Sequence, residues 1–466
     1  MIFSIPMSMF AGAIFTIMLG SKINPKKIAL FFSFLNLLMC FGSKTYLDKK
    51  IGLGGWSSEG GIVMSSDPIG SILVFLISLL GFLGILYASG NTAEKGKEHI
   101  LFFSLTMFLL GALQSISFSW DLFNMYVWLE LSAICAFALI GYKTKEGAFA
   151  SFRYLLTSGV AGVFFLLGVG FVYGVTGTLN LTKISNFAFV AGANTTLASG
   201  FILITLALLM KMAVTPFHFW LPQAYSNSPN KTLGIIPAIM TKAPAVVLLR
   251  LVFYIPATGT NWIINSDLVM YMGGIAVIYG SIMAIRQLGL KKLLAYSSIA
   301  QLGLVAIGIG LMNINGAMIQ IVAHSIMKFS LFCTVGALSS FAEIKTVPQL
   351  QELWRKSPTL SWVFLICGFS LAGIPPFAGF WAKYHLVLGA LESSNWVIVS
   401  VIVFSSLLTA AYFFKILEKI IYSRKGAAQK IKIPFSISFP ISLACVLTIF
   451  FGWGLSSVLA LLGGRI

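Results

Sequence analysis

Six ionisable side chains interrupt long apolar stretches of this chain. They are Glu130, Lys211, Lys242, Arg250, Lys328 and Lys383. Three histidines lie within or next to such stretches: His218, His324 and His385. A charged side chain at the centre of a membrane helix costs ~2.5–3.5 kcal/mol on insertion scales, so each one needs a partner, water or a function. The set predicts a polar pathway through the membrane. The alternative for each residue, and most of all for Arg250, is a side chain near a helix end that extends to the membrane surface.

A buried lysine beside a carboxylate can act as a proton switch. Burial lowers the pKa of a lysine, and a nearby carboxylate raises it again, so movement of the carboxylate loads or unloads the amine. Glu130 and Lys211 are the predicted pair. His324 and Lys328 are four residues apart and share one helix face, unless the histidine only packs in the core. Three polar side chains of the preceding apolar stretch could extend this face into a water chain: Ser297, Ser298 and Gln301.

Two apolar stretches are interrupted by proline in a similar way. Residues 215–220 read TPFHFW and follow Lys211, whereas residues 374–381 read IPPFAGFW and precede Lys383. Proline removes a helix hydrogen-bond donor and clashes with the preceding turn, so both helices should break here. Broken helices at matching places in two halves are typical of transporters built from inverted repeats. Two unrelated proline kinks are the alternative.

The composition places these residues in a membrane protein. Of the 466 residues, 58% are hydrophobic and only 9% are charged, and the mean hydropathy is +0.94. Soluble domains carry about 25% charged residues, so a soluble fold is excluded. The net charge of +18 could suggest a nucleic-acid partner, but in a membrane protein it first reports orientation. We therefore expect no nucleic-acid partner.

Apolar runs of spanning length predict an all-α integral membrane protein with about fourteen transmembrane helices. The seventh and twelfth are the broken ones. The predicted spans are 1–20, 28–43, 68–89, 99–119, 121–142, 152–174, 197–215, 231–255, 268–285, 291–312, 315–341, 358–390, 395–421 and 434–462.

The loops predict how the chain is oriented. Loops on one side of the membrane hold 20 basic residues and those on the other side hold 4, which places both termini outside the cell. No cleavable signal peptide is evident. The outer loop 44–67 contains glycine pairs and could hold a short hairpin. Five scattered cysteines predict neither a disulfide framework nor a metal or cofactor site.

Residues 211–225 (KMAVTPFHFWLPQAY) resemble the K-x-x-x-x-P-x-H-x-W-L-P-x-A-[YH] signature of proton-translocating antiporter-like subunits. Such subunits occur in complex I (N, M and L), in Mrp sodium/proton antiporters (A and D) and in membrane-bound hydrogenases. Further matching segments lie in the family's order at residues 128–130, 241–250, 291–303, 324–328 and 373–383. The resemblance covers predicted spans three to thirteen. A short chain without a long lateral helix favours a D-type Mrp or hydrogenase-like subunit.

The two breaks are five spans apart, and an odd separation predicts two inverted five-helix repeats, residues 99–255 and 268–421. They are flanked by helices 1–3 with their outer loop in residues 1–98 and by helix 14 in residues 434–466. The resemblance implies a prokaryotic plasma membrane, other membrane subunits as partners, protons as the translocated ion with sodium left open, and no cofactor. The residues to which it assigns proton translocation are Glu130, Lys211, His218, Lys242, His324, Lys328 and Lys383.

Within this set the resemblance implies a carboxylate–lysine pair at Glu130 and Lys211 and a terminal charged residue at Lys383. Two other functions remain open from the sequence. An autonomous transporter of a small solute would need a binding cluster at the helix breaks, where only Phe219 and Trp220 stand out. A membrane redox enzyme would need paired histidines or clustered cysteines. The sequence does not choose between Mrp-type, hydrogenase-type, sulfane-reductase-type and quinone-reducing complexes.

Overall fold

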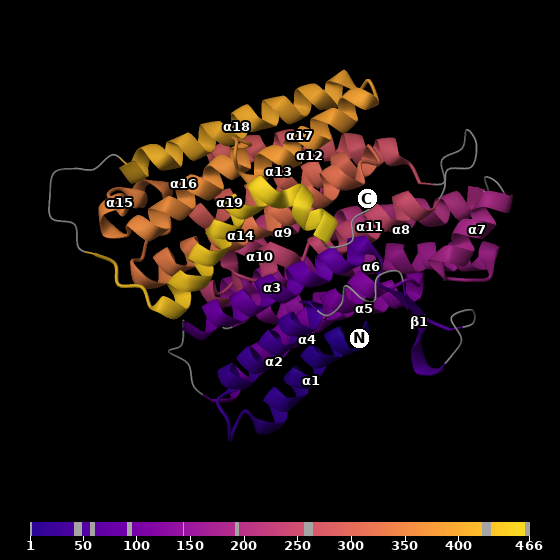
Figure 1. Ribbon diagram of the computed structural model, residues 1–466, viewed down its shortest axis with the longest axis horizontal. Helices are drawn as coiled ribbons and strands as arrows, with labels where there is room; N and C mark the ends of the chain where they lie inside the picture. The colour runs from indigo at the N-terminus through magenta and orange to yellow at the C-terminus, as the bar shows by residue number, and fades with distance from the viewer. Residues whose placement is uncertain are drawn as a thin grey trace.

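The computed structural model describes residues 2–41, 49–55, 61–90, 96–142, 144–191, 195–255, 264–421 and 430–461, which are almost entirely α-helical (Figure 1). The predicted all-α membrane fold is confirmed, because ten helices in this part of the chain are long and apolar enough to cross a membrane. These ten are α3 (Pro68–Gly90), α4 (Lys97–Phe118), α5 (Leu122–Ile140), α6 (Lys145–Thr176), the stretch Asn230–Tyr254, α12 (Ser266–Arg286), α13 (Leu290–Gly310), α14 (Ile314–Phe341), α18 (Trp396–Ile421) and α19 (Phe435–Leu461).

The remaining helices are shorter. Three are apolar, namely α1 (Ser4–Leu19), α8 (Thr195–Lys211) and α16 (Pro358–Ala372). Two more are α2 (Pro25–Phe41) and α17 (Ala378–Glu392). The predicted number of fourteen spans is not confirmed by this set. Residues 181–191, where no helix was predicted, form α7 (Leu181–Ala191), whose eleven residues are too few to span a membrane.

Burial separates the inner helices from those that face lipid. The apolar windows of α14 and of the stretch 230–254 are buried throughout, whereas only 33% of the window in α18 is buried. In Figure 1, α14 lies between the N-terminal helices α1–α4 and the layer of α16, α17 and α18. Helix α19 returns across this middle layer and packs on α14, α3 and α16. Polar residues of α14 are therefore held inside the protein rather than against lipid.

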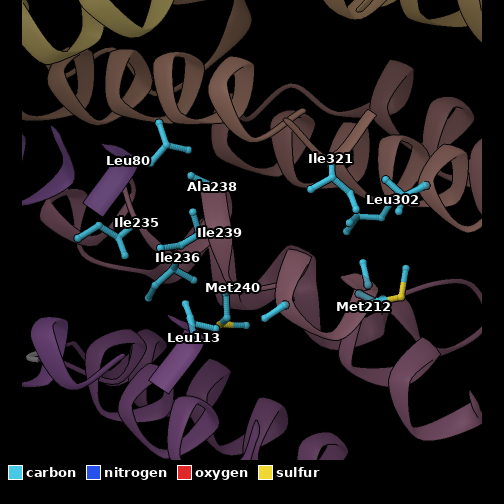
Figure 2. Close-up of a cluster of buried hydrophobic side chains, with 14 of the residues drawn as sticks. Leu80, Leu113, Met212, Ile235, Ile236, Ala238, Ile239, Met240, Leu302 and Ile321 are labelled. Atoms are coloured by element: carbon cyan, nitrogen blue, oxygen red, sulfur yellow. The ribbon is translucent and has the colours of Figure 1, made fainter. Parts of the chain in front are cut away.

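The stretch 230–254 is not one helix. It consists of a 3-10 turn, η4 (Asn230–Thr232), a single helical turn, α10 (Ile236–Ile239), and α11 (Lys242–Tyr254). Figure 2 shows the apolar side chains around α10, with Ile235 to Met240 lying between Leu80 of α3 and Leu113 of α4. All of these side chains belong to the main hydrophobic core. This packing fixes the point at which α11 begins, and α11 begins with a lysine.

The hairpin predicted between residues 44 and 67 is confirmed. Strands β1 (Lys50–Gly52) and β2 (Val63–Ser65) pair antiparallel, with Ile51 opposite Met64. Met64 also forms a bridge with Ser119, which follows the end of α4. The hairpin is thereby attached to the helix bundle at one end of α4.

A neutral hydrogen-bond network joins the N-terminal helices. The Gln114 amide nitrogen donates to the Asn36 carbonyl oxygen at 2.7 Å, and the Asn36 nitrogen donates back to Gln114 at 3.2 Å. Gln114 also donates to the Ser78 hydroxyl at 2.9 Å, and Asn36 to the Ser8 hydroxyl at 2.9 Å. Asn36 and Gln114 are both fully buried. The network links α1, α2, α3 and α4 without any charge.

Arg250 holds several elements together at the far end of α11. It is fully buried, so it does not reach the membrane surface as the alternative interpretation supposed. Its guanidinium donates to both carboxylate oxygens of Asp67, which precedes α3, and lies 5.5 Å from the centre of the Trp120 ring. It also donates to three backbone carbonyls at the end of α4, those of Ile116, Ser117 and Ser119. This clamp joins α11, α3, α4 and the hairpin region.

We expect Asp67→Asn to destabilise the protein by about 3–5 kcal/mol, because it leaves the buried Arg250 charge without a carboxylate. The measurement is thermal unfolding of the purified protein in detergent. The matched control is Asp267→Asn in the exposed first turn of α12, which should change stability by no more than ~0.5 kcal/mol. Equal midpoints for the two variants would show that the clamp contributes little.

Candidate functional site

Glu130 and Lys211 meet inside the helix bundle, as the sequence predicted. The Lys211 Nζ donates to Glu130 Oε1 at 3.0 Å and to the Ser158 hydroxyl of α6 at 3.0 Å. The lysine side chain is 6% exposed and the glutamate side chain is 27% exposed. Helix α6 passes close to the carboxylate because residue 162 is glycine, where a Cβ would lie 2.7 Å from Glu130 Oε1. The Lys211 ammonium is therefore held by one charged partner, Glu130, and one neutral partner, Ser158.

The first predicted helix break places Lys211 at a helix end. Helix α8 stops at Lys211, and the chain continues through η3 (Phe217–Phe219) into α9 (Trp220–Asn227). The Trp220 indole nitrogen donates to the Met210 carbonyl at 3.1 Å and its ring stacks on Tyr154, which stabilises the break. The C-terminal end of a helix carries partial negative charge, so this position suits an ammonium group.

His218 lies in this break but faces another way. Its ring contacts Phe219 and lies 4.4 Å from the ring of Tyr279 on α12, measured between centroids. Its Nδ1 atom is buried without a hydrogen-bond partner among the described residues. The structure therefore places His218 at the contact between the break and α12, and shows no bond between it and the lysines.

Three basic groups lie together at the centre of the protein. Lys242, at the start of α11, donates to the Pro237 carbonyl at 2.7 Å, and it is fully buried like His324 and Lys328 of α14. His324 and Lys328 lie one turn apart on α14, and α11, which begins at Lys242, packs against this helix. Neither ring nitrogen of His324 has a hydrogen-bond partner among the described residues. The histidine is therefore buried next to Lys328 without a fixed partner.

The partners of Lys328 come from α13. Its ammonium donates to the Leu294 carbonyl at 2.9 Å and to the Ser297 hydroxyl. The other two polar residues expected in a water chain do not contact Lys328: Ser298 donates to the same Leu294 carbonyl, and Gln301 accepts a 2.7 Å bond from Gln320 of α14. The predicted polar face therefore exists, with Ser297 as its contact to the lysine.

The second predicted break also puts a lysine at a helix end. Helix α16 stops at Ala372 and α17 begins at Ala378. Lys383 Nζ donates to the carbonyls of Leu371 and Ala372 at 3.0 and 3.1 Å, and to the Ser406 hydroxyl of α18 at 3.0 Å. These carbonyls are the last two of α16. Lys383 thus binds the C-terminus of α16 through oxygens that carry no full charge, whereas Lys211 is itself the last residue of α8 and binds Glu130 and Ser158.

Sequence reasoning missed several partners of the charged residues. Ser158 and Ser406 bind lysines, yet a serine in an apolar helix gives no signal by itself. Asp67 could have been found, because a buried arginine requires a carboxylate and few acids lie near the same side of the membrane. What the arrangement can do follows from its chemistry. Lysine and histidine side chains exchange protons, and the structure buries four lysines and His324, with a carboxylate bonded to Lys211.

Comparisons with known proteins agree with this geometry. Residues 119–409 match the NADH:quinone oxidoreductase/Mrp antiporter transmembrane family. The chain is 35% identical to the N subunit of NADH-quinone oxidoreductase from Desulforudis audaxviator (strain MP104C), over 78% of this chain and 74% of that protein. It is 29% identical to the D subunit of the Na(+)/H(+) antiporter from Bacillus subtilis (strain 168), over 87% of this chain and 83% of that protein. A chain of the membrane-bound sulfane sulfur reductase, an archaeal respiratory membrane complex, is similar with a TM-score of 0.91 and 25% identity, over 99% of this chain and 95% of that chain.

Gly373 tests how closely the second break fits its lysine. It ends α16 with φ +85°, and a Cβ there would lie 3.0 Å from Lys383 Cδ. Gly177 ends α6 with φ +66° and has no atom within 4 Å of a Cβ. Alanine should therefore cost about 1–2 kcal/mol of backbone strain at either position. We expect Gly373→Ala to lower the thermal midpoint more than Gly177→Ala does, because only the former displaces a buried side chain. Equal losses would mean that Lys383 moves aside freely.

Proposed function

The chain belongs to the NADH:quinone oxidoreductase/Mrp antiporter transmembrane family, and we propose that it moves protons along its row of buried basic residues. The relatives are subunits of Mrp antiporters, complex I and membrane-bound respiratory complexes. They support an ion-translocating subunit of a multi-subunit membrane complex over an autonomous solute transporter. The partners of this chain are accordingly other membrane subunits.

The observation that carries the proposal is the ion pair between Glu130 and Lys211 at the end of α8. When the carboxylate is within 3.0 Å, it compensates the ammonium charge in a site with little water. When the carboxylate moves away, the ammonium is uncompensated, and burial then favours loss of its proton. Glu130 is the more exposed partner, so it is the group that a neighbouring subunit can attract. Its movement would release a proton from Lys211 into the protein.

The central group receives this proton. None of the three basic groups is bonded to a carboxylate in the described part of the chain. Lys242 binds a carbonyl, Lys328 binds a carbonyl and a hydroxyl, and His324 has no hydrogen-bond partner among the described residues. Charging two of them at once would place like charges in a poorly solvated interior, which is strongly unfavourable. One proton on the group therefore repels the next. This repulsion moves the charge on from Lys242 through His324 to Lys328.

Lys383 is the last member of the row. Its partners at the end of α16 stabilise an ammonium by partial charges and one hydroxyl. Without a carboxylate bound to it, the site holds a proton less firmly than an ion pair would. We place the release of the proton at Lys383. His218, next to the first break, would connect the lysines to water.

The two breaks support the division into repeats. We infer that residues 99–255 and 268–421 are inverted five-helix repeats, since each contains one broken helix with a lysine at the break: Lys211 ends α8, and Lys383 binds the last carbonyls of α16. The flanking regions 1–98 and 434–466 lie outside the repeats. Both termini outside the cell and a prokaryotic plasma membrane are parts of the same proposal, supported by the distribution of basic residues.

The row is suited to protons rather than to sodium. Sodium is a hard cation, and hard cations bind to several oxygen ligands at once. Among the described residues of the row only Glu130 offers a carboxylate, and every other member is a base. We therefore assign proton movement to this chain and sodium movement, where a complex of this family performs it, to another path.

We expect Lys211→Ala to reduce proton transport by the assembled complex by about 100-fold or more, because the first proton-exchanging group is lost. The measurement is the fluorescence of a pH-sensitive dye in vesicles that contain the complex purified with its partner subunits. The control is Lys292→Ala, which removes an exposed lysine at the start of α13.

Lys211→Arg sharpens this test. Arginine keeps the positive charge beside Glu130 but does not release its proton, so it should preserve assembly and still abolish transport. Transport at the unaltered rate in either Lys211 variant, with the complex intact, would disprove the proposal.

A further inference from the structure

Helix α18 carries a line of hydroxyl groups that the row of lysines does not include. They are the adjacent Ser405 and Ser406, then Thr409 and Tyr412 at spacings of three or four residues, so that they lie on one side of the helix. Ser405, Thr409 and Tyr412 are buried within a helix whose opposite face exposes Phe404, Leu407 and Phe414. A polar line on the inner side of a lipid-facing helix requires a reason, because apolar residues would pack there equally well.

One end of this line is bonded to Lys383. Among the described residues the polar partners of Lys383 are two backbone carbonyls and the Ser406 hydroxyl. The carbonyls accept hydrogen bonds but have no proton to pass on. Among the described residues, Ser406 is therefore the one side chain hydrogen-bonded to Lys383 that can pass a proton to it.

The other end of the line lies where α18 packs against α13. Tyr412 is buried on α18, Thr409 lies one turn before it on the same face, and α13 carries Ser297. Ser297 is the residue that accepts a hydrogen bond from the Lys328 ammonium. The Tyr412 hydroxyl itself is buried and makes no direct hydrogen bond within the described residues. A buried hydroxyl without a partner costs about 1–3 kcal/mol, so packing alone does not explain the position of Tyr412.

We propose that the Tyr412 hydroxyl is a proton relay between Lys328 and Lys383. A phenol both accepts and donates a hydrogen bond. Tyr412 would accept the proton that leaves the Lys328 ammonium by way of Ser297 and release its own proton toward Thr409 and Ser406. The amine of Lys383 gains that proton, Lys328 becomes neutral, and the phenol is unchanged once its O–H has rotated back. This relay rests on the proposed function of the lysine row.

Tyr412→Phe removes the hydroxyl and keeps the ring. We expect it to slow proton transport by the reconstituted complex roughly ten-fold or more while assembly and thermal stability are retained. The matched control is Tyr87→Phe, because Tyr87 is equally buried and its hydroxyl donates to the Cys333 carbonyl at 3.1 Å, away from the row. Transport at the same rate as the unaltered complex in Tyr412→Phe would overturn the relay.

A fluorinated tyrosine at position 412 separates a relay from a structural role. It has nearly the same shape but a more acidic phenol, so a relay predicts a shifted pH profile of transport, and the same replacement at position 87 predicts none. An unshifted profile at position 412 would overturn the proposal. Ser406→Ala combined with Tyr412→Phe should lose no more than the more severe single variant, because both groups act in series. Additive losses would show that they belong to different routes.

Lys211→Ala is measured in the same vesicles. If it abolishes transport while Tyr412→Phe does not, the lysine row stands and only the relay is wrong. If Lys211→Ala transports normally, the proposed function fails and the relay fails with it.

Discussion

Every buried ammonium group in this protein needs an oxygen atom, and this requirement governs the architecture around it. Helical backbone carbonyls are already occupied by their own hydrogen bonds, except in the last turn of a helix. The fold interrupts helices next to three of the four buried lysines that the structure describes, whereas Lys328 binds the Leu294 carbonyl within α13. Lys211 lies at the end of α8, Lys383 binds the final carbonyls of α16, and Lys242 begins α11 after the interrupted segment around α10. The interruptions provide charge compensation within the membrane.

The basic residues divide into two kinds by how completely they are compensated. Arg250 has a carboxylate and three backbone carbonyls, and it is placed to hold helices together. The lysines of the row have fewer partners, and His324 has none among the described residues. A fully compensated charge is fixed, whereas a partly compensated one can change its protonation state at a moderate cost. Under the proposed function, buried basic residues thus serve stability at Arg250 and proton movement at the lysines.

The arrangement of helices by burial protects the row from lipid. Helix α14, which is buried over its whole apolar length, carries His324 and Lys328. The lipid-facing helices α6 and α18 bind lysines through serine hydroxyl groups on their inner sides. Neutral networks such as that of Asn36 and Gln114 connect the N-terminal helices without adding charge. Ion movement and helix assembly therefore use different kinds of polar group.

The sequence by itself determined the membrane fold, both helix breaks and the identity of the ionisable residues. Apolar length, proline and charge inside an apolar run are local properties, so each could be recognised without knowing the neighbours. It also identified the Glu130–Lys211 pair, because a single carboxylate among several lysines left little choice. Only the tertiary structure decided that Asp67 compensates Arg250, that His218 faces α12, and that serines of α6, α13 and α18 bind the lysines. These contacts join residues far apart in the chain, and they depend on how helices pack, which no local pattern specifies.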